Sequence, residues 1–193
     1  MSDPADAYQS ALEKLADGTA RAARRAANRR NVTKAMRAAN VAAIVQRGNA
    51  QALALAEMFT ARQLEHVTGR AALAKGLLPT DDSDRLTKAA KTILADPDPL
   101  GRAERLAMAE VLHTAQGAVQ ESLTGKRKGR GGYLGWVRQL DAEACPKCQH
   151  WARNGRVWPP QHPMPRHFNC RCVQRLVITP EAPKPVKTRK KQR

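Results

Sequence analysis

Residues 141–172 read "DAEACPKCQHWARNGRVWPPQHPMPRHFNCRC" and contain all four cysteines and three of the five histidines of the chain. Two residues separate Cys145 from Cys148, and two residues separate His167 from Cys170. Ligands at this spacing point at one ion from a tight turn, and two such turns brought together make a tetrahedral zinc site. The stretch therefore predicts a zinc-binding module.

A tetrahedral ion has four positions, whereas this stretch offers five ligands, namely Cys145, Cys148, His167, Cys170 and Cys172. The first four are the preferred set, because "HFNC" repeats the spacing of "CPKC". Cys172 replaces His167 if the chain curls after Cys170. On a flat strand, Cys170 and Cys172 would face opposite sides and only one of them could bind.

The predicted zinc is structural, because protein groups fill all four positions and leave none for water. His150 and His162 lie outside the paired spacing. The alternative for the cysteines is two disulfides or free thiols. The chain starts without the charged-then-apolar pattern of a secretory signal and has no run of about 18 apolar residues, so we expect a reducing cytoplasm and no membrane.

Positive charge is concentrated in the C-terminal part of the chain. The formal net charge of the chain is +17. Residues 122–193 carry 17 Lys and Arg against three Asp and Glu, a net charge of +14, so residues 1–121 carry only +3. A segment of this charge is expected to meet a polyanion, most commonly nucleic acid, by phosphate contacts without sequence specificity. The predicted nucleic-acid-binding residues are Lys126, Arg127, Lys128, Arg130, Lys184, Lys187, Arg189, Lys190, Lys191 and Arg193.

The fold class is predicted to be α+β and predominantly α. Only 4% of the residues are aromatic and much of the 42% hydrophobic content is alanine, so we expect slender, closely packed helices rather than a broad core. Apolar periodicity, capping residues and breakers such as "DPDP" predict four helices. They are expected over residues 1–30, 41–69, 83–95 and 100–123.

The chain is predicted to divide into four parts. Glycine and basic residues in "GKRKGRGGYLG" predict a flexible loop after the helices. "WVRQLDA" and "CVQRLVI" alternate apolar and polar residues, which predicts two short strands. These strands would form a small β module with too thin a core to fold without zinc. The expected parts are a helical domain (1–124), a Gly/basic loop (125–135), a zinc-binding β module (136–179) and a disordered basic tail (180–193).

These motifs resemble the phage Mu protein F-like head-morphogenesis family over about residues 105–173. Its signature is a helix with an Arg–Glu pair, a Trp-led strand, a C-x2-C knuckle and a terminal H-x2-C-R-C. The matching positions outside the metal ligands are Arg105, Glu110, Trp136, Asp141 and Arg171.

The match departs from the family at three positions. Met108 and Ala109 stand where the family usually has Arg and Thr, and Phe168 stands where it usually has Pro. The first two departures put a polar surface on the helix in doubt, whereas the third affects only the stiffness of a turn. Arg105 and Glu110 are interpreted as structural residues that tie the long helix to the zinc module.

The resemblance implies a bacteriophage minor capsid protein, associated with the portal protein inside the procapsid and acting in head morphogenesis. It further implies location in the virion interior, after assembly in the host cytoplasm, and a role that is not enzymatic. One alternative is a zinc-knuckle DNA-binding regulator, although no recognition helix follows the second ligand pair. The other is a nuclease with a histidine-bound metal at "QHPMPRH". His66 and His113 lie within predicted helices and are not expected to be catalytic.

Overall fold

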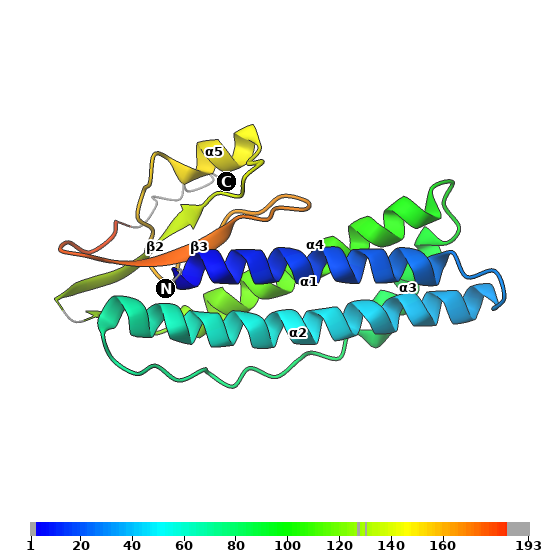
Figure 1. The fold of residues 1–193 in the computed structure, drawn as a ribbon, viewed down its shortest axis with the longest axis horizontal. Helices are drawn as coiled ribbons and strands as arrows, with labels where there is room; N and C mark the ends of the chain where they lie inside the picture. The colour runs from blue at the N-terminus through cyan, green and yellow to red at the C-terminus, as the bar shows by residue number, and fades with distance from the viewer. Residues whose placement is uncertain (1–2, 127, 130, 185–193) are drawn as a thin grey trace, which may run out of the picture.

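Four helices precede a small antiparallel sheet, which is accompanied by one short helix (Figure 1). The structure is a computed structural model and describes residues 3–126, 128–129 and 131–184. Within these residues the elements are α1 (Pro4–Ala27), α2 (Lys34–Thr68), α3 (Ser83–Ile93), α4 (Pro99–Leu123), β1 (Lys128–Gly129), β2 (Gly132–Gln139), α5 (Pro146–Ala152) and β3 (Val173–Thr179). The predicted α+β class, predominantly α, is confirmed.

The ends of the helices follow from their capping residues. The Asp3 carboxylate accepts a hydrogen bond from the Ala5 backbone N–H at 2.8 Å, and the Thr33 hydroxyl accepts one from the Met36 N–H at 3.2 Å. Gly69 ends α2 with a φ of 65°, a left-handed conformation that glycine adopts without strain. The four predicted helices are therefore present, and α1 ends three residues earlier than predicted.

Helices α1, α2 and α4 lie side by side along the long axis of the molecule, and α3 packs on α2 and α4 (Figure 1). Alanine supplies much of their contact surface, as predicted from the composition. A Cβ atom on Gly48 would lie 2.7 Å from Cγ2 of Thr19 and 3.0 Å from Cγ2 of Val111, so this glycine permits the close approach of α2 to α1 and α4.

The sheet has the strand order β1-β2-β3, with both pairs antiparallel and with Trp136 opposite Leu176. The predicted loop over residues 125–135 is wrong in part, because β1 and the start of β2 lie within it. Two of the glycines there, Gly132 and Gly135, permit close contacts. A Cβ atom on Gly132 would lie 2.4 Å from the Thr179 carbonyl oxygen, and one on Gly135 would lie 2.4 Å from Val157.

The hydrophobic core runs without interruption from the helices into the sheet. Leu134 and Trp136 of β2 belong to the same buried cluster as Tyr8 and Leu12 of α1 and Leu112 of α4. The helices and the sheet therefore share one hydrophobic core. The apolar faces of the strands are too small to close a core alone, and the helices supply the remainder.

The predicted basic tail falls largely outside the described residues, which end at Lys184. Residues 180–184 are in neither helix nor strand. In the described part of the chain, no helix combines the length and the apolar character needed to cross a bilayer.

Candidate metal centre

Two tight turns present the predicted ligands. Cys145 is the N-cap residue of α5, where Pro146 occupies the first turn, so Cys148 lies one turn into the helix. In the second turn the Cys170 N–H donates to the His167 carbonyl at 3.3 Å, and Asn169 adopts a left-handed φ of 58°. Sequence spacing predicted the two turns but not the short helix.

The five predicted ligands come together between α5 and the start of β3. Nε2 of His167 lies 3.2 Å from Sγ of Cys145 and 3.0 Å from Sγ of Cys148, and Sγ of Cys148 lies 3.5 Å from Sγ of Cys170. The ligand atoms form two groups of three that share Cys148: Cys145, Cys148 and His167 in one, and Cys148, Cys170 and Cys172 in the other. All four cysteines are free, and these ligand distances are compatible with a metal site.

Further contacts distinguish the ligands. His167 directs Nδ1 at the Phe168 carbonyl oxygen at 2.7 Å, a hydrogen bond that requires the proton on Nδ1 and leaves the Nε2 lone pair facing the sulfurs. Sγ of Cys172 lies 3.6 Å from Oδ2 of Asp141, a possible acceptor for its thiol proton. Asp141 therefore meets the cluster through Cys172.

Arg138 is the buried cation of the cluster, at 5% exposure. Its Nη1 lies 3.5 Å from Sγ of Cys170 and 3.7 Å from Sγ of Cys148, and its Nη2 donates to the Pro165 carbonyl. The guanidinium carbon also lies 5.3 Å from the centre of the Trp151 ring. A buried guanidinium needs nearby negative charge, which thiolates provide.

Sequence reasoning missed Arg138, although a signal was present. Side chains alternate along a strand, so Arg138 shares the inward face of β2 with Leu134 and Trp136. A charged residue in an inward register, a few residues before a cysteine pair, indicates a buried anionic partner.

The cluster separates the pKa values of the cysteines. Hydrogen bonding from the backbone N–H of Cys148 lowers the pKa of Cys145. Hydrogen bonding from Cys172, together with the charge of Arg138, lowers the pKa of Cys170 to about 5. Burial raises the pKa of Cys148 to about 12, and the pKa of Cys172 is raised because its thiol hydrogen-bonds to Cys170.

The helices hold the cluster in place through buried and partly buried polar contacts. Gln116 of α4, at 4% exposure, donates from Nε2 to the carbonyl oxygens of Cys170 and Cys172, each at 3.2 Å. Arg171 forms a two-point ion pair with Asp17 of α1, with nitrogen–oxygen distances of 2.6 and 3.2 Å. Arg171, the residue between Cys170 and Cys172, therefore connects the cluster to α1.

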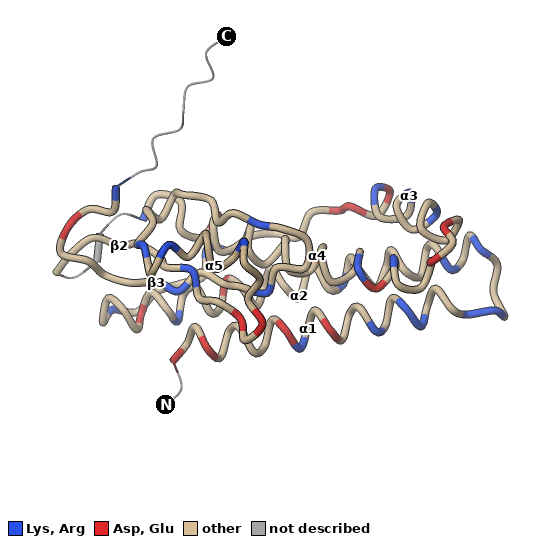
Figure 2. The backbone as a smooth tube through the Cα atoms, turned by 90° about the horizontal axis from the view of Figure 1, so that it is seen from above, with Lys and Arg blue, Asp and Glu red and all other residues tan. Residues whose placement is uncertain are grey.

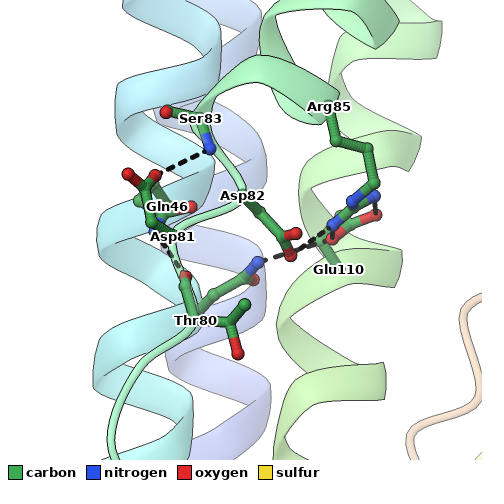
Figure 3. Close-up of polar contacts among 8 residues, drawn as sticks. Gln46, Thr80, Asp81, Asp82, Ser83, Arg85 and Glu110 are labelled. Carbon is green, nitrogen blue, oxygen red and sulfur yellow. Dashed lines mark hydrogen bonds and ion pairs between the residues drawn. The ribbon is translucent and has the colours of Figure 1, made fainter.

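Arg105 and Glu110 do not pair with each other in the structure. Arg105 pairs with Asp98 at 3.2 Å, and Glu110 accepts from Arg85 of α3 at 2.7 and 2.8 Å, as Figure 3 shows. Arg85 also pairs with Asp82 at 2.9 Å in the connection between α2 and α3. The interpretation that Arg105 and Glu110 tie α4 to the metal module is wrong, because both side chains fasten the end of the molecule where α3 packs.

The other aromatic and histidine residues of the stretch have packing roles or stand apart. Trp136 is fully buried, and its Nε1 donates to the His162 carbonyl at 3.2 Å. The His162 ring stacks on Trp158 with a centroid distance of 4.4 Å, and it belongs to neither metal-compatible group. His150 is exposed and also lies outside both groups.

The predicted nucleic-acid-binding residues are described only in part. Lys126 and Lys184 are exposed, and Lys128 contributes its backbone to β1. Several other basic residues of this region bond within the protein, including Arg138, Arg171, and Arg175, which pairs with Asp3. The remaining predicted residues lie outside the described part of the chain, namely Arg127, Arg130, Lys187, Arg189, Lys190, Lys191 and Arg193.

The fold and the cluster define a mostly helical protein with a cysteine–histidine cluster, compatible with a metal site, next to a small sheet. No protein-family model matches the chain, no curated protein matches it, and no solved structure matches it.

Proposed function

We propose that the cluster binds one structural zinc ion through Cys145, Cys148, His167 and Cys170. Distances of 3.0–3.5 Å connect these four ligand atoms in series, whereas Cys172 lies near Cys170 and also has Asp141 as a hydrogen-bond acceptor. Three thiolates and an imidazole are a common zinc ligand set, and Arg138 offsets part of their negative charge. Four protein ligands leave no position for water, which favours a structural role over hydrolysis.

The chain is further proposed to act as a bacteriophage minor capsid protein in head morphogenesis, associated with the portal. The observation that carries this proposal is the placement of the residues behind the family resemblance. Three of these residues lie in or around the cluster. Trp136 fills the core, Asp141 faces Cys172, and Arg171 pairs with Asp17 of α1. The cluster and α1 come from distant parts of the sequence and are joined by this ion pair. A surface held together in this way suits an assembly component better than an enzyme.

Gradient sedimentation with portal protein and procapsids from the same phage tests this proposal. The zinc-loaded chain is expected to sediment with portal-containing particles in a fixed ratio to the portal. The Cys148→Ser variant is expected to remain near the top of the gradient, because it loses the ligand that both metal-compatible groups share. The matched control is Cys172→Ser, which is expected to sediment like the wild type. Recovery of the wild-type chain only as a free species contradicts the proposal.

A further inference from the structure

A second basic region lies at the end of the molecule opposite the sheet. Residues 18–56 contain eight Lys and Arg and no Asp or Glu, a concentration that the small net charge of residues 1–121 conceals. They form the C-terminal half of α1, the turn and the first part of α2 (Figures 1 and 2). Five exposed cations here, named the hairpin patch, are Arg21, Arg25, Arg29, Arg30 and Lys34.

The hairpin patch has no carboxylate partner among the described residues. The acidic side chains near the start of α4 are already engaged: Glu104 pairs with Arg24 at 3.0 Å, Asp98 with Arg105, and Asp96 with Arg102. Arg37, the other cation near the turn, donates to the Ala27 carbonyl oxygen at 3.4 Å. The five residues of the patch therefore leave their charge to the solvent.

Helix stability does not explain all of these positions. Arg24 and Arg25 in the last turn of α1 suit the negative end of its dipole. Lys34 and Arg37, however, begin α2, whose first turn has no acidic residue, and cations at this positive end are unfavourable. A bound polyanion would relieve this repulsion and would also meet the free N–H groups of the first turn of α2.

The composition of the region indicates which polyanion fits. Seven of the eight cations in residues 18–56 are Arg, whose planar guanidinium suits phosphate groups. Arg21 and Arg25 are separated by one helical turn, which places them on the same side of α1. Met36 is the only large hydrophobic side chain exposed in this region, so the apolar face that a membrane-surface helix requires is missing.

We propose that the hairpin patch is a binding site for the phosphate backbone of duplex DNA, distinct from the C-terminal basic residues. Binding is electrostatic and independent of base sequence, because the patch offers charge and no large aromatic surface. With one such surface at the far end of the helices, the chain holds DNA away from the metal-binding end.

Fluorescence anisotropy with a labelled 20-base-pair duplex, at several NaCl concentrations, tests the proposal on the full chain. The test variant carries Arg25→Gln, Arg29→Gln and Arg30→Gln. The control carries Lys14→Gln, Lys88→Gln and Lys91→Gln, three exposed residues outside the patch with the same total change of charge. Both sets are measured alone and together with Lys187→Gln, Arg189→Gln, Lys190→Gln and Lys191→Gln, which removes most of the charge of the tail.

The patch variant is expected to lose about tenfold or more in affinity near 0.1 M NaCl, in both backgrounds, and to reduce the slope of log K against log salt by about 3. The control variant should change both quantities much less, and unfolding midpoints should stay close to that of the wild type. Equal losses in the two variants overturn the proposal, because net charge alone would then explain binding. Patch-dependent binding of anionic phospholipid vesicles or an acidic peptide, with no patch-dependent duplex binding, also overturns it.

Discussion

Gln116 joins the metal cluster to α4, and its substitution gives a quantitative prediction. Its amide nitrogen carries two hydrogens and donates to the carbonyls of Cys170 and Cys172, which are 1% and 0% exposed. Gln116→Met preserves most of the side-chain volume but removes both bonds. Each buried acceptor left unpaired costs about 1–2 kcal/mol, and removal of the unpaired Gln116 Oε1 offsets about 1 kcal/mol, which leaves a destabilisation of about 2 kcal/mol.

Urea unfolding of the zinc-loaded chain measures this destabilisation, and transfer of zinc to a colorimetric chelator measures its effect on the cluster. Gln116→Met is expected to release the metal faster, because the loop that carries Cys170 loses its anchor. Gln120→Met is the matched control: Gln120, also on α4, donates to the Pro160 carbonyl at 3.1 Å and contacts no ligand residue. A destabilisation by Gln116→Met below about 0.5 kcal/mol, or equal zinc release from both variants, would show that Gln116 does not anchor the loop that carries Cys170.

Four further substitutions test the cluster and the contacts around it. Cys170→Ser should abolish stoichiometric zinc binding, measured by metal analysis after gel filtration, whereas Cys172→Ser should retain one zinc per chain. If Cys172→Ser lost the zinc and Cys170→Ser retained it, Cys172 would be the ligand in place of Cys170. Arg138→Met should weaken zinc affinity about tenfold or more, measured by chelator competition, and an unchanged affinity would exclude charge compensation. Hydrogen bonds from Arg85 lower the pKa of Glu110, so Glu110 stabilises the fold above the unfolded pKa of about 4.3 and loses this effect as the pH falls through the lower folded pKa. Glu110→Gln should therefore cost up to about 1 kcal/mol in urea unfolding at pH 7 and much less near pH 3, and a cost independent of pH would contradict the ion pair.

Local sequence patterns predicted the helices and the metal ligands because both depend on near neighbours. A cap such as Asp3 acts within two residues, and a two-residue spacing fixes how Cys145 and Cys148 face one ion. The pairing of β2 with β3 was partly visible in the alternation of apolar residues. Its extension through Gly132 and Gly135 was missed, because glycine indicates flexibility and close packing equally in sequence.

The joining of the sheet to the helices could not be predicted from the sequence. Arg171 and Asp17 lie 154 positions apart, and Gln116 lies 54 positions before Cys170. No periodicity connects such residues, and both polar side chains could equally have faced water. The same limit applies to Glu110, since Arg85 reaches it only after α3 packs on the bundle.

One metal ion is proposed to join the two cysteine turns of this chain, and native mass spectrometry can detect that ion in the intact protein. The measurement uses the chain purified under reducing conditions, before and after chelation and after denaturation in acid. We expect a single folded species with one zinc per chain, whose charge-state distribution broadens when the metal is removed. A native species without transition metal, or a denatured mass lower by the four hydrogens of two disulfides, would show that no metal joins the two turns.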